Sequence, residues 1–350
     1  MSLLEIRDLK IHYRTQHGYA QAVDGVSFAV EHNECLGLVG ESGCGKSTLV
    51  KSVLRLFPPN GFAAGGHIFF QGRDILALGS GDLRRLRWKE ISMITQSAMN
   101  ALDPVQRVGD QVIESIVAHE KVGRAEAMQR AEELFELVGL DRKRVRDYPH
   151  QFSGGMRQRV MIAMALSLNP ILILADEPTT GLDVVTQDQI LRQVRQIRQE
   201  FKKAMLLVTH NMAVVAENCD RAAVMYAGKI MEIGPTRQVL EHPYNPYTLG
   251  LRNAFPSMKQ DRILISIPGS PPNLVNPPPG CRFYDRCPFH SNVCREEMPP
   301  LTQVTSDQST ACHHWTRIEE IRELAKREET WQAFGPAGGA KKRMAHLVGN

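Results

Sequence analysis

The sequence has 350 residues, of which 43% are hydrophobic and 23% charged, and this much apolar material can bury a core and excludes a wholly disordered chain. Its 42 basic and 38 acidic residues leave a net charge of +4, which gives little support to a nucleic-acid-binding surface. No run reaches the roughly 18 uninterrupted apolar residues of a membrane span, and the acidic, alternating N-terminus does not resemble a secretory signal. We therefore expect a cytosolic protein, for which any membrane role requires partner chains.

Residues 3–39 have the pattern of β-strands, and a helix is predicted soon after them. Larger apolar residues alternate with smaller or polar ones over Val26–Val30, as in a half-buried strand. Cys35–Val39 is a short apolar run followed by glycine, as expected of a parallel strand buried on both faces. Ser47–Leu56 has a helical pattern that the following prolines end.

From about residue 82 to residue 168 the pattern becomes largely helical. The apolar residues of Ala125–Val138 fall on one helix face, with charges opposite. Strand patterns return at Ile171–Ala175, Ala204–Thr209 and Ala222–Tyr226. This order predicts an α/β core that a helical subdomain interrupts.

The composition changes after about residue 235. Pro268–Pro279 holds six prolines in twelve residues, which excludes a helix or central strand and predicts a stiff, extended connector. Cysteines follow, and then a charged helical stretch over Ile318–Arg327. We therefore divide the chain into a domain over 1–235, an extension over 236–335 and a flexible tail over 336–350.

The segment after the strand Cys35–Val39 has the form of a phosphate-binding loop. The motif G-x-x-x-x-G-K-[ST] is matched in full by Gly40-Glu41-Ser42-Gly43-Cys44-Gly45-Lys46-Ser47. Its glycines let backbone N–H groups face a phosphate, and the helix N-terminus adds positive potential. We expect Lys46 to reach the β- and γ-phosphates, and the Ser47 hydroxyl, with Thr48 beside it, to bind Mg²⁺.

Two adjacent carboxylates follow a second apolar strand. Asp176 and Glu177 come directly after Ile171–Ala175, and a buried strand presents such residues at its C-terminal tip. Asp176 is placed to hold Mg²⁺, directly or through water. Glu177 is placed to polarise the water that attacks the γ-phosphate. Alone the pair could be a helix cap and a surface acid, but after a full phosphate loop it predicts ATP hydrolysis.

A second helix start in the chain also suits an anion. Ser153, Gly154 and Gly155 stand where the apolar helix that contains Val160–Leu168 opens. Because the chain has one phosphate loop, this helix start has no nucleotide of its own. A head-to-tail dimer would use both the phosphate loop and this helix start, because each nucleotide would be clamped between two chains.

Over about residues 3–235 these motifs resemble those of ABC ATPases. Phe152–Met156 resembles the signature motif of that family, although Met156 stands where glutamine is usual. Asp176–Asp183 resembles its Walker B segment and D-loop. The other matches, in family order, are Tyr13 as the aromatic that stacks on adenine, Gln96 as the Q-loop glutamine and His210 as the switch histidine. For Tyr13 the alternative is a plain strand residue, and Tyr19 lies close by.

The resemblance implies roles for these residues. His210 would contact the γ-phosphate and help to orient the water and Glu177. Gln96 would sense the phosphate and Mg²⁺ and report their state to the helical insertion, which contacts the membrane subunits. Asp183 would act across the dimer interface, and Ser153–Gly155 of one chain would face the nucleotide of the other.

Beyond residue 235 the chain resembles the ATPases of oligopeptide, dipeptide and nickel uptake systems. The matching segments are Glu241–Tyr244, Ile267–Pro272, Gly280-Cys281 and Arg286–Pro288. Systems of this kind have two membrane subunits, two related ATPases and an external binding protein. The resemblance therefore implies an importer.

Four cysteines cluster in the extension: Cys281, Cys287, Cys294 and Cys312. They are separated by five, six and seventeen residues, wider than the tight pairs of most zinc sites. Thiolates also suit iron–sulfur clusters, and some members of the branch carry a [4Fe–4S] cluster at similar cysteines. The alternatives are Zn²⁺, reduced thiols or a disulfide formed on purification, with His313 and His314 as other ligands.

We therefore expect a P-loop α/β core with an antiparallel β subdomain and a helical insertion, plus a small cysteine-containing regulatory domain. Two ATPase chains, related but different, would close over two Mg-ATP at the cytoplasmic face of the inner membrane. They would drive two transmembrane permease subunits supplied by an external solute-binding protein, with no nucleic acid involved. Peptides are the expected solute, with nickel and oligosaccharides open. The alternatives are a soluble ABC ATPase of DNA repair or translation, disfavoured by the single cassette without heptads, and a regulator that only binds ATP.

Overall fold

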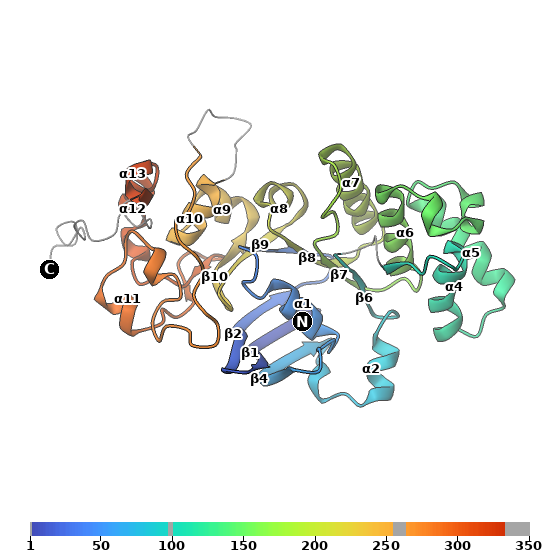
Figure 1. The fold of residues 1–350 in the computed structure, drawn as a ribbon, viewed down its shortest axis with the longest axis horizontal. Coiled ribbons are helices and arrows are strands. Elements are labelled where there is room, and N and C mark those ends of the chain that lie inside the picture. Colours follow the sequence, from blue (N-terminus) through green and yellow to red (C-terminus); the bar gives the residue numbers. More distant parts are fainter. Residues whose placement is uncertain (1, 97–100, 255–263, 333–350) are drawn as a thin grey trace.

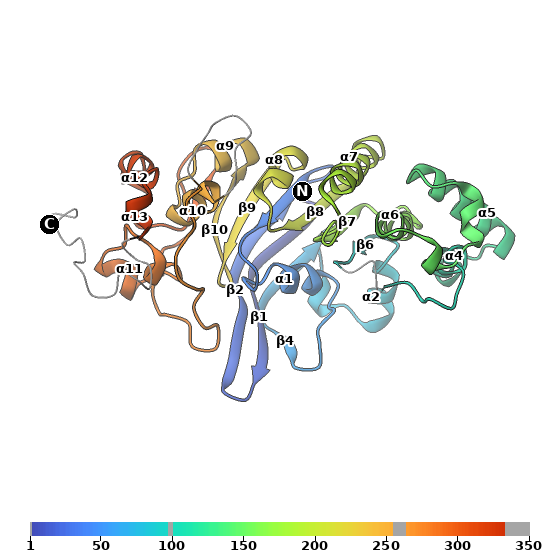
Figure 2. The ribbon, with the colours of Figure 1, turned by 45° about the horizontal axis from the view of Figure 1, so that its top comes forward.

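The structure, a computed structural model, describes residues 2–96, 101–254 and 264–332. Two sheets form its frame (Figures 1 and 2). The larger sheet is ordered β11 (Thr302–Gln303), β12 (Ser309–Thr310), β10 (Lys229–Pro235), β9 (Arg221–Tyr226), β3 (Cys35–Val39), β8 (Ala204–Thr209), β7 (Leu172–Asp176), β6 (Ile91–Ile94). The smaller sheet is ordered β2 (Gly18–Val30), β1 (Leu4–Thr15), β4 (Gly61–Phe70), β5 (Arg73–Asp74).

The centre of the larger sheet is parallel, from β6 through β7, β8 and β3 to β9. Every residue of β3, β7 and β8 is buried, because the sheet is covered on both faces and its strands are apolar throughout. Successive side chains of a strand point to opposite faces. Leu172 and Leu174 accordingly lie in one hydrophobic core, and Ile173 and Ala175 in the other.

The smaller sheet and α1 (Lys46–Val53) cover one face of the larger sheet, as the antiparallel β subdomain expected from the sequence. Leu49, Val50 and Val53 of α1 pack in one core with residues of both sheets. This packing fixes α1, and with it the loop that precedes it, against the end of β3.

Helices cover the other face of the larger sheet, and some of them form a lobe beyond β6, green in Figure 1. They are α4 (Val108–His119), α5 (Arg124–Leu137), α6 (Gly154–Leu166), α7 (Val184–Glu200) and α8 (Met212–Asn218). Within the expected helical range 82–168 lie α4, α5, α6 and the end of another helix, α2 (Ser80–Leu86), but also the sheet strand β6. The bounds of a helical subdomain stay a prediction. Among the described helices, none is long and apolar enough to cross a membrane.

The C-terminal extension lies at the opposite end of the sheet, orange and red in Figure 1. Its longer elements are α9 (Thr236–Glu241), α10 (Pro246–Asn253), α11 (Asn292–Glu296), α12 (Ile318–Ala325) and α13 (Glu328–Gln332). Strand β12 pairs with β10, placing Thr310 opposite Glu232, so the larger sheet continues across residue 235. The division of the chain at that residue stays a prediction, and the expected tail over 336–350 lies outside the described residues.

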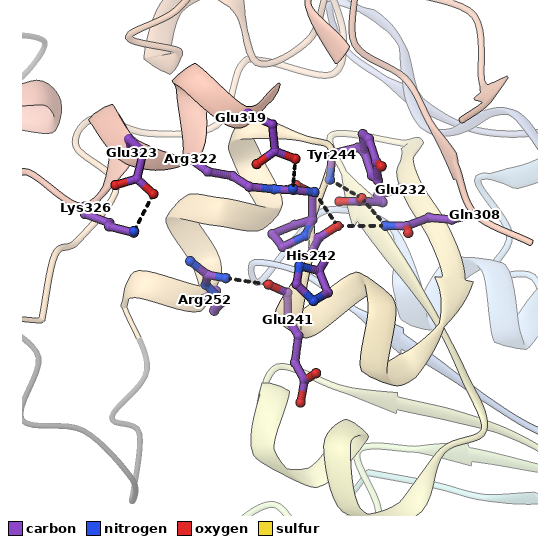
Figure 3. A network of polar contacts seen from close by, with 11 residues as sticks. Glu232, Glu241, His242, Tyr244, Arg252, Gln308, Glu319, Arg322, Glu323 and Lys326 are labelled. Carbon is purple, nitrogen blue, oxygen red and sulfur yellow. Dashed lines mark hydrogen bonds and ion pairs between the residues drawn. The ribbon is translucent and has the colours of Figure 1, made fainter. Parts of the chain in front are cut away.

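A buried carboxylic acid joins β10 to the extension (Figure 3). Glu232 is fully buried, and its Oε1 accepts hydrogen bonds from Gln308 Nε2 (2.8 Å) and from the Tyr244 backbone N–H (2.5 Å). Nearby, Arg322 donates to the carbonyls of His242 (2.9 Å) and Pro243 (3.1 Å). Burial raises the pKa of Glu232 to about 7, although its hydrogen bonds act in the opposite direction.

Replacing Glu232 with glutamine should remove a pH dependence of stability. Because the folded-state pKa lies above the ordinary value of 4.5, wild-type stability from this group is complete below pH 4.5 and is lost as the pH rises towards 7. Between pH 5 and 7.5 we expect the wild-type free energy of unfolding to fall relative to Glu232→Gln by roughly 2–3 kcal/mol. Urea unfolding at several pH values measures this difference. The exposed Glu241→Gln is the control, and parallel curves for wild type and Glu232→Gln would contradict the prediction.

Candidate functional site

The phosphate loop connects the end of β3 to the start of α1, as predicted. Gly45 caps α1 with a left-handed φ of 106°, and a Cβ there would stand 2.0 Å from the carbonyl oxygen of Ala22. Only glycine fits such a position. No side chain caps the helix, so its first N–H groups are free of side-chain acceptors and suit the oxygens of a phosphate.

The Lys46 ammonium lies across the loop. The residue is only 5% exposed, and its Nζ donates to the carbonyls of Gly40 and Glu41, both at 2.8 Å. These partners are neutral, so the ammonium is a buried charge without a counter-ion among them. An anionic phosphate would supply that counter-ion, which supports the role predicted for this lysine.

Ser47 and Asp176 meet as the magnesium prediction requires. The Ser47 hydroxyl donates to Asp176 Oδ1 at 2.7 Å, and Asp176 is almost fully buried at the end of β7. Burial raises the pKa of the Asp176 carboxyl, against the lowering effect of the Ser47 hydrogen bond. Mg²⁺ is usually held by one or two protein oxygens together with substrate phosphates, and this pair offers such oxygens next to the loop.

Glu177 lies between the other two predicted catalytic side chains. Gln96 follows β6, Glu177 follows β7 and His210 follows β8, and these strands are neighbours in the sheet. Gln96 Nε2 donates to Glu177 Oε2 at 3.0 Å, and His210 Nδ1 lies 3.4 Å from Oε1. The Thr180 hydroxyl also donates to Oε2, at 2.8 Å. The structure therefore brings Gln96, Glu177 and His210 together around one carboxylate.

The backbone of Glu177 is strained. Its φ is 47°, in the left-handed region that a glutamate rarely adopts, and its N–H donates to the Val208 carbonyl at 3.0 Å. Strain of this kind concentrates at functional sites. Here it turns the chain directly after Asp176, the last residue of β7.

The signature segment stands on another part of the chain. Ser153 caps α6 and accepts from the Met156 N–H at 3.3 Å, while Asp183 caps α7 by accepting from the N–H and hydroxyl of Thr186 at 2.9 and 2.7 Å. A Cβ on Gly155 would lie 2.5 Å from Thr186 Cγ2. The starts of α6 and α7 are therefore in contact. Within the described residues, no hydrogen bond or ion pair joins Ser153–Gly155 to the phosphate loop.

Tyr13 lies against the start of α1. Its hydroxyl is 2.9 Å from Thr48 Oγ1, and Gly61 lies so close that a Cβ there would come within 2.9 Å of the Tyr13 ring. Tyr19 is 54% exposed and contacts Phe62 edge to face. The stacking of adenine on Tyr13 stays a prediction.

Sequence reasoning missed two side chains that reach the loop from beyond residue 235. The Tyr247 hydroxyl accepts from the Glu41 N–H at 3.0 Å, and Arg286 Nη1 donates to Glu41 Oε2 at 2.8 Å. Arg286 belongs to a segment that matched the uptake ATPases, but nothing in its local pattern connects it with a loop 245 residues earlier. The one signal in the sequence was that Arg286 stands in that matching segment.

The four clustered cysteines line one small cavity of about 20 Å³, together with His290, His313 and His314. Burial raises the pKa of Cys281 to about 11 and of Cys312 to about 12, so these thiols stay protonated at neutral pH. In the described parts of the chain, no group of three or more His, Cys, Asp or Glu side chains is arranged to hold a metal ion. The structure thus collects the predicted cysteines but does not support the predicted cluster.

Two family models match different parts of this chain. The family described as "ABC transporter" matches residues 23–180, and "Oligopeptide/dipeptide transporter, C-terminal region" matches residues 231–294. A probable peptide ABC transporter ATP-binding protein of Sinorhizobium fredii is 44% identical over 324 residues, covering 91% of this chain and 96% of the relative. The oligopeptide transport ATP-binding protein OppD of Escherichia coli is 43% identical over 323 residues, covering 91% and 95%.

A solved structure matches the core. The dimeric post-hydrolysis state of the ATP-binding cassette MJ0796, bound to ADP and Pi, has a TM-score of 0.61 at 25% identity. The match covers 67% of this chain and 99% of the cassette. The remaining third of this chain therefore lies outside the compared fold.

Placing alanine at Gly45 should abolish nucleotide binding. The left-handed backbone alone costs about 1–2 kcal/mol, and the added Cβ would collide with the Ala22 carbonyl. We expect loss of saturable binding of a fluorescent ATP analogue and a lowered melting temperature. Gly81→Ala, where a Cβ meets no atom within 4 Å, is the control and should leave both unchanged. Normal binding by Gly45→Ala would show that the loop does not hold the phosphates.

Proposed function

The chain belongs to the ATP-binding proteins of ABC transporters, and from this premise we propose that it powers an importer of di- or oligopeptides. The predicted family, the P-loop core and the ATP-hydrolysing activity are confirmed. The observation that carries the hydrolytic part of the proposal is the position of the Glu177 carboxylate, next to Asp176 in the chain and between Gln96 and His210. The peptide part rests on the similarity to peptide transport proteins.

Each group at the site has a role in hydrolysis. Lys46, whose ammonium has three donors and uses two of them on the carbonyls of Gly40 and Glu41, would bind the phosphates of ATP together with the N–H groups of the loop. Mg²⁺, held by Ser47 and Asp176, would offset the negative charge of the phosphates.

Glu177 would accept the proton of the attacking water. Its Oε2 is occupied by Gln96 and Thr180, while Oε1 faces His210. We infer that Gln96 and His210 hold this carboxylate in line with the γ-phosphate, and that His210 contacts the γ-phosphate as the family resemblance implies.

The ATPase is proposed to act as a dimer. Ser153, Gly154 and Gly155 of each chain would contact the nucleotide bound by the other, with Asp183 at the interface. Val184 and Val185, directly after Asp183, are 79% and 67% exposed. Exposed apolar residues at this place support burial against a second ATPase chain.

The wider assembly follows from the family. ATP-binding subunits of importers act with transmembrane permeases, so we place this chain at the cytoplasmic face of the inner membrane, beside two permease subunits and an external solute-binding protein. The second ATPase is proposed to be a related but different chain. The named relatives are peptide transport proteins, which favours peptides over nickel or oligosaccharides.

Glu177→Gln should bind ATP normally but hydrolyse it roughly 10²–10⁴ times more slowly, since it lacks the general base. The measurement is the ATPase rate of the complex with its permease and partner ATPase in lipid vesicles, with and without peptide-loaded binding protein. Glu217→Gln, at an exposed glutamate on α8, is the control. Peptide should stimulate the wild type and nickel should not. A wild-type rate from Glu177→Gln would exclude this mechanism, and stimulation by nickel alone would exclude the peptide assignment.

We propose the [4Fe–4S] cluster separately. The presence of four cysteine side chains in one place supports it, but their arrangement in the structure does not. A cavity of about 20 Å³ has room for roughly one water molecule, so a cluster would require the thiols to move apart and to ionise. Protein purified without oxygen should then contain about four iron and four sulfide per chain, as expected of this cluster type. Iron-free protein in which all seven cysteines are alkylated after unfolding, with one alkylated thiol fewer in the Cys287→Ser control, would count against it.

A further inference from the structure

The second residue of the phosphate loop is held by the C-terminal extension. Arg286 Nη1 donates to Glu41 Oε2 at 2.8 Å, and the Arg286 side chain is only 7% exposed. A buried ion pair is specific in geometry, and removing one partner leaves an uncompensated charge. Glu41 is therefore held by a charge that comes from the far end of the chain.

Other contacts fix the Arg286 guanidinium in place. Its Nε donates to the Pro268 carbonyl at 2.8 Å and its Nη2 to the Ile267 carbonyl at 3.3 Å. Its Nη1 also lies 3.1 Å from the Tyr226 hydroxyl, at the end of β9. The proline-rich connector and the core sheet thus hold the arginine on one side, and Glu41 meets it on the other.

The backbone of Glu41 is held as well. Its N–H donates to the hydroxyl of Tyr247, a fully buried residue of α10, and its carbonyl accepts from Lys46 Nζ at 2.8 Å. The rings of Tyr247, Tyr226 and Phe283 pack together with centroids 4.5–5.4 Å apart. The N–H of Glu41 is thereby bonded to the extension, and its carbonyl to the phosphate-binding lysine.

We propose that Arg286 and Tyr247 are positioning residues for ATP, so that the extension is a working part of the nucleotide site. This inference rests on the proposed ATPase function. Arg286 neutralises the Glu41 carboxylate, and Tyr247 orients the peptide group that Lys46 contacts. Without Arg286, the unpaired carboxylate of Glu41 within the loop would repel the ATP phosphates. The loop would then be held to the extension by Tyr247 alone of these two residues.

The effect of the Arg286 charge can be distinguished from the effect of its packing. Arg286→Gln leaves Glu41 charged and unpaired, whereas Arg286→Gln combined with Glu41→Gln removes both charges. The double variant should therefore recover much of the ATP affinity that the single variant loses. Arg286→Lys keeps the charge with fewer donors and should fall between wild type and Arg286→Gln.

Arg282→Gln is the matched control. Arg282 is also a buried arginine of the extension, but it pairs with Asp24 at 2.7 Å and with Gln21 at 3.1 Å, both on β2 rather than on the loop. Its loss should lower the melting temperature without changing the interaction with ATP.

The test compares these full-length variants in the assembled ATPase complex, by ATPase kinetics and by equilibrium binding of a fluorescent ATP analogue. Arg286→Gln should raise KM and the analogue Kd roughly tenfold, within the range of couplings between sites, and change kcat less than about twofold. An unchanged KM in folded Arg286→Gln, an equal shift in Arg282→Gln, or no recovery in the double variant would overturn the proposal. A wild type that binds the analogue but does not hydrolyse ATP would instead contradict the proposed function.

Discussion

The nucleotide site depends on parallel pairing at the centre of the larger sheet. Strands β3, β8, β7 and β6 are neighbours that run in one direction, so their carboxyl ends reach the same edge. Polar residues at or after the ends of three of these strands consequently meet within hydrogen-bond distance, as Ser47 with Asp176 and Gln96 with Glu177 do. The apolar residues before them are buried on both faces, and this burial holds the edge rigid.

The parts of the site carried by contiguous motifs are predictable from sequence. The phosphate loop and the Asp176–Glu177 pair each stand directly after a buried apolar run, so local pattern and strand order suffice to place them. Gln96 and His210 have no local pattern of their own, and their placement depended on family order. The structure then showed that the order β8, β7, β6 sets Glu177 between them.

Other features lie beyond local pattern. Strands β11 and β12 have two residues each, too few for a period of two to appear in the sequence. The pairing of Glu41 with Arg286 joins residues 245 positions apart, and neither residue type predicts the other. The cysteines were recognised as a cluster by their spacing along the chain, and their side-chain arrangement differs from the one that a metal ion would need. Contacts of this kind follow from packing of the whole chain rather than from any segment.

The pairing of β12 with β10 also bears on how the chain is made. Ribosomes deliver the core strands first, yet the outer edge of β10 receives its partner only when residues 309–310 have emerged. Until then that edge offers unpaired backbone groups, which favour strand pairing with other chains. The acid Glu232 must likewise wait for Gln308 to shield it. A nascent chain paused before this point would therefore be prone to aggregation and in need of a chaperone.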